Sequence, residues 1–154
     1  MKLFLPDEAA QEAFGARLAA AMPGAGGLVI YLEGNLGAGK TTLVRGFLHG
    51  SGHLGHVRSP TYTLIEPYDI AGRCIAHLDL YRLGDPEELE YLGLRDLLGE
   101  SCILLVEWPE KGRGVLPPAD LRLGLTFPGS GRALSLEAAS PEGGAILEML
   151  DTSS

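Results

Sequence analysis

The segment from Gly34 to Thr41 constrains the fold more than any other part of the chain. It reads Gly-Asn-Leu-Gly-Ala-Gly-Lys-Thr, which matches the phosphate-binding pattern of Gly, four residues and then Gly-Lys-Thr. An apolar run at 28–33 precedes it and is typical of a buried parallel strand, and residues 40–49 have the pattern of a helix that ends before glycines. This order predicts an α/β domain in which the N–H groups of the loop surround a phosphate.

Two side chains of this loop have expected roles at a bound phosphate. Lys40 is placed to reach the terminal phosphates, and the Thr41 hydroxyl is placed to ligate magnesium. The alternative is a glycine-rich turn without a ligand, which the flanking strand and helix disfavour.

The other expected elements agree with one α/β domain. Helices are expected at 7–22, 85–98 and 141–150, the first two with Asp7 and Asp85 as N-caps. Strands are expected at 61–66 and 74–81 as one hairpin, at 102–107, and at 121–127 and 133–138 as a second hairpin. We therefore predict a P-loop NTPase-like fold: a mixed, mostly parallel sheet flanked by helices, with a C-terminal β-hairpin. Residues 1–138 are expected to form a single domain, and residues 139–154 a tail that holds the short helix.

Two carboxylates follow strand-like runs and are candidates for the chemistry. Glu107 ends the apolar run 103–106, where the acidic partner of a phosphate loop is expected, and an exposed strand end is the alternative. Asp79 shares one face of its expected strand with His77 and Tyr81, a pattern that a solvated edge strand also produces. Both roles can coexist, since one carboxylate can hold magnesium while the other orients an attacking water.

A hydroxyl-rich loop follows the helix after the phosphate loop. Ser59, Thr61 and Thr63 lie where nucleotide-sensing loops tend to occur, and they could contact a γ-phosphate or a metal-bound water. Ser and Thr are also ordinary loop residues, so the sequence leaves both interpretations open.

The remaining charged side chains favour no single role. Three arginines are candidate transition-state cations, with surface solvation as the alternative for each: Arg82, Arg113 and Arg132. Three histidines lie among glycines and are expected to be solvated: His49, His53 and His56. The acidic side chains of the helix at 85–98 are either its wet face or a docking surface for a partner.

Charge and hydropathy exclude several classes of protein. The chain has 20 Asp and Glu against 12 Lys and Arg, and the whole excess of −8 lies in residues 78–154. Such a chain lacks the basic surface that supplies most nucleic-acid affinity, so we do not expect it to grip RNA unaided. No apolar run approaches the length of a membrane span, and the apolar run at the start of the chain ends too early for a signal peptide, so a cytoplasmic protein is expected.

Cys74 and Cys102 are expected to be reduced core residues.

Within the phosphate-loop proteins, two classes are disfavoured. Asn35 is the only asparagine and already lies in the phosphate loop, so the Asn-Lys-x-Asp motif that reads guanine cannot be present. A small kinase would need a basic lid and an acceptor pocket, and the chain after Glu107 offers few basic residues for them. What remains is a minimal ATP-binding domain.

Four ordered motifs resemble those of the bacterial TsaE family, formerly YjeE. They lie at 36–42, 59–64, 77–83 and 106–112, within a similarity that runs from about residue 5 to 138. The family is the ATPase subunit required for N6-threonylcarbamoyladenosine (t6A) modification of adenosine 37 in tRNAs that read codons beginning with A. The tail after about residue 139 is outside the resemblance.

The resemblance implies roles for particular residues. Thr41 and Glu107 would hold magnesium, Asp79 would be needed for hydrolysis, and the loop 59–63 would act as a nucleotide switch. The predicted catalytic residues are therefore Asp79, Glu107 and Lys40. The residues implied in binding ATP are Gly37, Ala38, Gly39, Lys40, Thr41, Thr42, Gln11 and Arg132. Gln11 stands where the family commonly has a hydroxyl residue. The implied partners are TsaD and TsaB, which would hold the tRNA.

Two hypotheses follow from the sequence. The first is an ATPase that is slow alone and activated by its protein partners, with the arginine finger supplied by a partner, by Arg82 or by Arg113. The second is a nucleotide-gated binding module in which occupancy by ATP, not turnover, controls assembly. A small P-loop kinase is a further alternative.

Overall fold

The computed structural model describes residues 1–35 and 37–152, so Leu36 of the first motif and the last two residues of the tail lie outside the described residues. The strands are β1 Lys2–Leu5, β2 Leu28–Glu33, β3 Ile65–Ile70, β4 Arg73–Asp79, β5 Ile103–Glu107, β6 Leu121–Thr126 and β7 Arg132–Ala138. The helices are α1 Glu8–Ala20, α2 Lys40–Gly50, α3 Glu88–Tyr91, α4 Leu94–Gly99 and α5 Pro141–Thr152, with a 3-10 helix at Pro109–Gly112.

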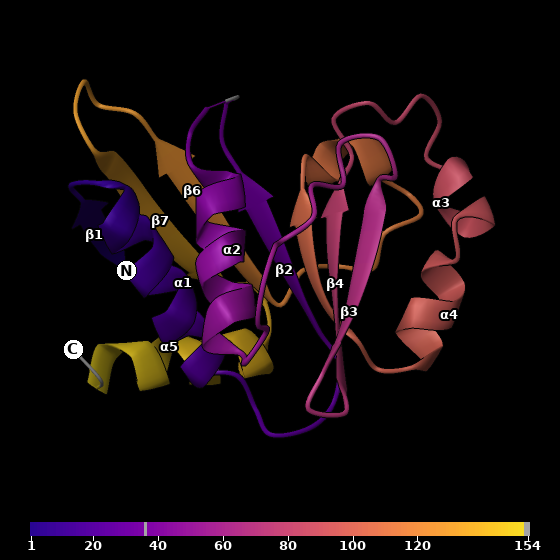
Figure 1. The fold of residues 1–154 in the computed structure, drawn as a ribbon, viewed down its shortest axis with the longest axis horizontal. Helices are drawn as coiled ribbons and strands as arrows, with labels where there is room; N and C mark the ends of the chain where they lie inside the picture. Colours follow the sequence, from indigo (N-terminus) through magenta and orange to yellow (C-terminus); the bar gives the residue numbers. More distant parts are fainter. Residues whose placement is uncertain (36, 153–154) are drawn as a thin grey trace.

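Within the described residues, the strands form one sheet in the order β1-β7-β6-β2-β5-β4-β3 (Figure 1). β2 pairs in parallel with β5 and β6, and β5 pairs in parallel with β4. The β3–β4 and β6–β7 pairs are antiparallel, and β1 adds an antiparallel edge to β7. The α/β class, the mixed sheet with its parallel centre and the C-terminal hairpin are therefore confirmed.

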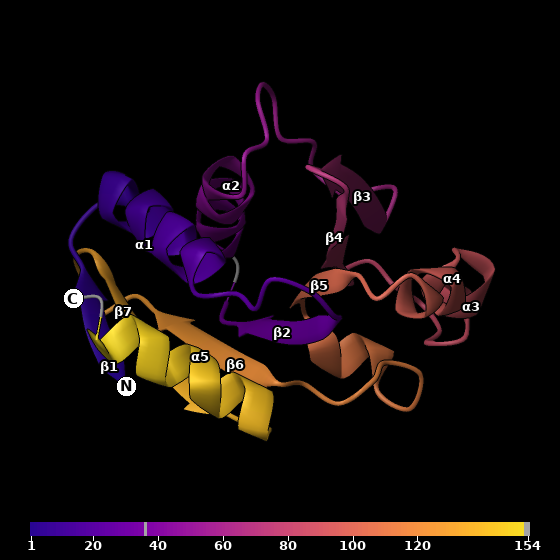
Figure 2. The ribbon, with the colours of Figure 1, turned by 90° about the horizontal axis from the view of Figure 1, so that it is seen from below.

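The central strands form because their sequences are apolar on both faces. β2 and β5 lie side by side in parallel register, with Ile30 opposite Leu105, and both side chains are fully buried. Helices α1 and α2 cover one face of this part of the sheet (Figure 2). The opposite face of β4 and β5 packs against α3 and α4, through Leu89 and Leu94.

Helices α1 and α2 approach each other unusually closely. Asp7 caps α1 as expected, because its carboxylate accepts the N–H of Ala10 at 2.8 Å. Gly15 and Gly46 stand at the crossing, where a Cβ would lie 2.2 Å from the Leu43 carbonyl oxygen and 2.1 Å from that of Glu12, respectively. The missing side chains let α1 lie directly beside the helix that carries the phosphate loop.

Two expected elements differ clearly from the structure. The strand expected at 61–66 is wrong in position: residues 61–63 form a turn, Leu64 has φ 68°, and β3 begins at Ile65. The helix expected at 85–98 is two short helices, because Gly93 adopts φ 95° between them. Its expected start is present, since Asp85 accepts the Glu87 N–H at 3.0 Å while Glu88 accepts the Asp85 N–H at 3.1 Å.

The expectation of two reduced cysteines is wrong. Cys74 in β4 and Cys102 just before β5 form a disulfide. Both lie among apolar residues, as expected, but the parallel pairing of β4 with β5 brings two positions 28 residues apart in the sequence next to each other.

The C-terminal helix and the acidic helices complete the exterior. α5 packs on β7 and buries Ile146 and Leu150, and its carbonyl oxygen at Leu150 accepts the Arg17 guanidinium at 3.2 Å. The division of the chain at residue 138 stays a prediction.

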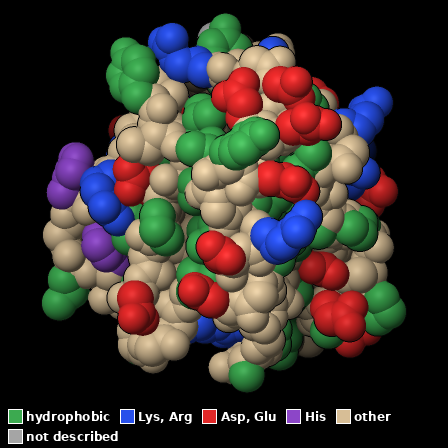
Figure 3. Space-filling view, turned by 90° about the vertical axis from the view of Figure 1, so that its right-hand side faces the viewer, with side chains coloured by type: hydrophobic (Ala, Val, Ile, Leu, Met, Phe, Trp, Pro, Cys, Tyr) green, Lys and Arg blue, Asp and Glu red, His purple; other side chains and the backbone are tan. Residues whose placement is uncertain are grey.

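Acidic side chains are spread over the face that α3 and α4 cover (Figure 3).

Candidate functional site

The candidate site lies where the parallel strands β2, β4 and β5 end. The phosphate loop follows β2, Asp79 is the last residue of β4, and Glu107 is the last residue of β5. Strand register places Glu107 between Leu32 of β2 and Asp79 of β4. Ligands of open α/β sheets bind at this carboxyl edge, so the topology alone brings the candidate groups together.

The phosphate loop leads directly into α2, which begins at Lys40. Gly39 has φ 100°, a conformation that favours glycine, and a Cβ there would lie 2.3 Å from Oε1 of Gln11. Gln11 is buried in α1 and therefore packs against the loop. The first residues of α2 line the cavity beside the loop. Because the first N–H groups of a helix have no partner within it, this end of α2 suits an anion.

The Lys40 side chain is held within the site. Its ammonium donates to the Gly34 carbonyl oxygen at 2.5 Å and lies 3.8 Å from the centre of the Trp108 ring. Burial lowers the pKa of Lys40 from its ordinary value, and the nearby carboxylates Glu107, Asp79 and Glu110 act in the opposite direction. The ammonium is thus a poorly solvated charge, which an anionic ligand would stabilise.

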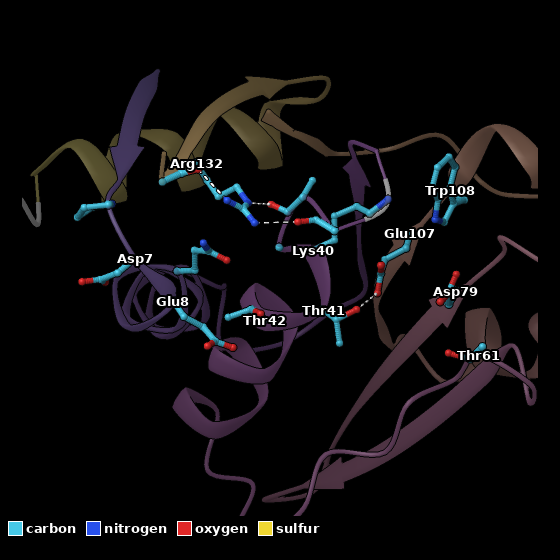
Figure 4. A pocket seen from close by; sticks show the side chains of 16 residues that line it. Asp7, Glu8, Lys40, Thr41, Thr42, Thr61, Asp79, Glu107, Trp108 and Arg132 are labelled. Carbon is cyan, nitrogen blue, oxygen red and sulfur yellow. Dashed lines mark hydrogen bonds between the residues drawn. The ribbon is translucent and has the colours of Figure 1, made fainter. Parts of the chain in front are cut away.

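The two candidate carboxylates lie next to each other. The Thr41 hydroxyl donates to Oε2 of Glu107 at 3.3 Å (Figure 4). Asp79 accepts the N–H of Tyr81 at 3.1 Å. Burial and then the charge of Glu107 raise the pKa of Asp79, against the smaller effects of Tyr81, His77 and Lys40. Adjacent carboxylates with a hydroxyl beside them offer the hard oxygen ligands that Mg²⁺ prefers.

A cavity of about 590 Å³ joins these groups. Most of the residues that the sequence singled out line it: Gln11, Gly37, Ala38, Gly39, Lys40, Thr41, Thr42, Thr61, Asp79, Glu107 and Arg132. Ser59 and Thr63 do not line it. The Ser59 hydroxyl is 2.7 Å from that of Thr61, and the Thr63 hydroxyl donates to Glu66 at 3.0 Å. The loop 59–63 thus reaches the cavity through Thr61.

Arg132 faces the phosphate loop from the start of β7. Its guanidinium donates to the carbonyl oxygens of Ala38 at 2.9 Å, Gly37 at 2.8 Å and Gly131 at 2.8 Å (Figure 4). These contacts engage each of the three guanidinium nitrogens with a backbone oxygen and tie the loop to the C-terminal hairpin. A direct contact between Arg132 and a nucleotide stays a prediction.

The other two candidate arginines lie outside this cavity. Arg82 lies 5.0 Å from the ring centre of the exposed Tyr62, and Arg113 lines a separate, smaller cavity. The histidines at 49–56 contact the backbone of their own segment: His49 contacts the carbonyl oxygen of Gly55, and His53 contacts that of His56. No described residue of that segment lines the site cavity.

Two residues of the site were not singled out for a role by the sequence. Trp108 follows Glu107 directly, has φ 57° and covers Lys40 with its ring. His77 is completely buried, and its Nε2 lies 2.5 Å from Oε2 of Glu107. The available signals were the position of Trp108 next to Glu107 and the face that His77 shares with Asp79 in the strand pattern.

Comparisons with known proteins agree with this geometry. The sequence model of the family described as "Threonylcarbamoyl adenosine biosynthesis protein TsaE" matches residues 5–133. The tRNA threonylcarbamoyladenosine biosynthesis protein TsaE of Haemophilus influenzae is 47% identical over 147 residues, which cover 94% of this chain and 93% of that protein. The protein of the same name from Synechocystis sp. is 44% identical over 115 residues, covering 72% and 71% of the two chains.

A solved structure has the same fold. The crystal structure of Bacillus subtilis YdiB matches with a TM-score of 0.82 and 29% sequence identity, over 99% of this chain and 95% of that chain. Among the residues that the structure describes, no helix has the length and apolar character needed to span a membrane.

Proposed function

Because the chain belongs to the TsaE family, we propose that it is the ATP-binding and ATP-hydrolysing subunit required for t6A modification of adenosine 37 in tRNAs that read ANN codons. The observation that carries this proposal is the convergence of Lys40, Thr41, Asp79 and Glu107 on one cavity beside a phosphate loop. A fold alone would not support an activity, whereas this set of groups suits phosphoryl transfer to water.

Phosphate binding is assigned to the loop and Lys40. Backbone N–H groups at the start of α2 would bind the phosphate oxygens, and Lys40 would exchange its contact with Gly34 for the terminal phosphates. Burial of the ammonium favours this exchange, because the anion restores the interactions that Lys40 lost on leaving water.

Thr41 and Glu107 are the residues proposed to hold Mg²⁺. Their oxygens are already 3.3 Å apart at the edge of the cavity, which fits a small cation that takes protein and phosphate oxygens together. When bound, the ion would neutralise charge that develops on the phosphate oxygens.

Asp79 is proposed to orient the attacking water and to accept its proton. It lines the cavity beside Glu107, and its raised pKa brings it closer to the range in which a carboxylate can take a proton. Thr61, the member of the switch loop that lines the same cavity, is placed to sense the terminal phosphate.

The proposed setting is the cytoplasm, in a complex with TsaD and TsaB. Between residues 85 and 100 the chain has one Arg and otherwise only acidic charges, which suits contact with a protein partner better than contact with tRNA. The tRNA would therefore be held by the other subunits. Since no described arginine other than Arg132 lines the cavity, and Arg132 is bound to the loop, a partner is the proposed source of an arginine finger.

The test is release of phosphate from ATP, measured with and without the TsaB–TsaD pair. We expect slow release alone and stimulation by the pair, with Asp79→Ala still binding ATP but releasing little phosphate. Absence of release under both conditions would contradict the proposal. Transfer of phosphate to a small-molecule acceptor by the chain alone would indicate a kinase. An Asp79→Ala protein that supports repeated rounds of modification would indicate a nucleotide-gated binding module.

A further inference from the structure

His77 is a polar residue in the interior of the sheet. It lies within β4, its side chain is 0% exposed, and its Nε2 is 2.5 Å from Oε2 of Glu107. In the parallel pairing of β4 with β5, His77 stands opposite Leu105 and Asp79 stands opposite Glu107. The ring therefore reaches along the sheet face to the carboxylate two positions further on, at the edge of the cavity.

Packing does not account for a histidine at this position. Among the described residues, Nδ1 of His77 has no hydrogen-bond partner, although it is buried. A buried polar atom without a partner costs free energy, and a leucine in the same space would leave none. The hydrogen bond to Glu107 is the one hydrogen bond that the ring makes within the described part of the chain.

That hydrogen bond restricts the Glu107 carboxylate. The terminal torsion of a glutamate is broad, so an unsupported carboxylate would sample many orientations. Here Oε2 accepts from Nε2 of His77 and from the hydroxyl of Thr41, so the plane of the carboxylate is fixed from two directions. Thr41 lines the cavity and is itself a proposed ligand of Mg²⁺, whereas His77 does not line it and has no exposed surface.

We infer that His77 is a positioning residue, which holds the Glu107 carboxylate in the orientation in which it meets the Mg²⁺ of a bound nucleotide. The inference rests on the proposed function, in which Glu107 is a magnesium ligand. Residues that orient metal ligands typically contribute about 10–100-fold to metal affinity or activity when they are removed. His77 contacts neither nucleotide nor metal and acts through Glu107.

The experiment compares nucleotide binding across a range of Mg²⁺ concentrations and in EDTA. The probe is a fluorescent, slowly hydrolysed ATP analogue, and the variants are His77→Leu, His77→Gln and, as a matched control, His53→Leu, whose ring packs on Tyr68 away from the cavity. In His77→Leu the Mg²⁺ concentration for half-maximal tightening should rise by about 10–100-fold, while affinity in EDTA is unchanged. His77→Gln should recover most of this loss, because its amide can donate from a similar distance, and His53→Leu should match the wild type.

Two results would overturn the inference. One is a folded His77→Leu protein with the Mg²⁺ dependence of the wild type, and the other is an equal loss of affinity in Mg²⁺ and in EDTA, which would indicate general damage. If His77→Leu does not fold, His77→Gln and the shorter His77→Asn decide: equal Mg²⁺ dependence in the two overturns the inference, and a weaker dependence in His77→Asn alone supports it. A wild-type protein that binds the analogue without any effect of Mg²⁺ contradicts the proposed function itself.

Discussion

The two ends of the central parallel strands are built differently. At the carboxyl ends of β4 and β5, the carboxylates Asp79 and Glu107 are adjacent, and burial together with the charge of Glu107 raises the pKa of Asp79. At the amino ends of the same strands, Cys74 and Cys102 are covalently joined, and the backbone of Cys102 accepts the N–H of Leu28 at 3.4 Å. One end therefore keeps like charges together, and the other end keeps the strands together.

The groups that cost stability lie at the carboxyl ends of the strands. At the carboxyl ends the pKa values of Lys40 and Asp79 are displaced in the directions that disfavour their charged forms, and Trp108 adopts φ 57°. Groups kept in such states cost stability and are typical of functional sites. Substitutions at the two ends should consequently separate activity from stability.

The largest effect is expected at the carboxyl ends, from Lys40→Ala. Removing a preorganised cation from phosphate chemistry should lower the rate of phosphate release by about 10²–10³-fold. The free energy of unfolding should change little, because the cost of burying the poorly solvated ammonium offsets the contacts that are lost with it. Lys111→Ala, which changes an exposed lysine, is the control in the same phosphate-release assay. A Lys40→Ala protein as fast as the control would mean that the phosphates are bound elsewhere.

The next effect is expected at the amino ends, from loss of the disulfide. The cross-link spans 28 residues, so its removal should lower the free energy of unfolding by about 2–4 kcal/mol. Urea unfolding with and without a reducing agent measures this, and a Cys74→Ala/Cys102→Ala protein should be insensitive to the reducing agent. Nucleotide affinity should be the same in both forms, and a parallel fall in affinity would show that the two ends are coupled.

Asp79→Asn should stabilise the nucleotide-free protein while it abolishes most hydrolysis. Because burial and Glu107 raise the pKa of Asp79 in the folded protein, its charge costs stability above the pKa that it has in the unfolded chain. The substitution should add about 0.5–2 kcal/mol near neutral pH, as is common where function opposes stability. The gain should disappear as the pH falls through the raised pKa, since Asp79 is then protonated.

The control for this prediction is Asp96→Asn, on the exposed side of α4. Urea unfolding of both variants at neutral and mildly acidic pH gives the comparison. A loss of stability in Asp79→Asn at neutral pH would show that the carboxylate is well compensated and that the carboxyl ends carry no such cost.

The smallest effect is expected from Trp108→Leu. The ring contributes a cation–π contact to Lys40, worth about 0.5–1 kcal/mol at a partly exposed site, so the dissociation constant of the nucleotide should rise by less than about tenfold. Tyr91→Leu, on the exposed surface of α3, should leave it unchanged. Trp108 is the only tryptophan, so the intrinsic fluorescence of the wild type should also change on binding. A larger loss of affinity would mean that the ring contacts the nucleotide itself.

The sequence predicts the frame of the fold because its signals are local. Continuous apolar runs identify β2 and β5, and the glycine-rich loop between a strand and a helix places Lys40 and Thr41. Strand ends then place Asp79 and Glu107 at one edge, and the structure brings all four to one cavity. The four-residue strand β1 escapes such reasoning, because it is half exposed and is recognised only by its pairing with β7.

The contacts that the sequence does not predict are those that depend on which strands are neighbours in the sheet. The disulfide and the contact of His77 with Glu107 both require β4 and β5 to lie side by side, and nothing local to either strand states this. The contact of Trp108 with Lys40 likewise joins residues far apart in the sequence. Apolar surroundings were compatible with free thiols and with a disulfide, so composition could not decide between them.

The most direct test of the account is a crystal structure with Mg²⁺ and a slowly hydrolysed ATP analogue. We predict that the triphosphate lies in the loop from Gly34 to Thr41 with Lys40 on its terminal phosphates. Thr41 and Glu107 should contact the Mg²⁺, which leaves Asp79 for the attacking water. A nucleotide bound outside this cavity, or an ion held by Asp79 with Glu107 turned away, would contradict the account.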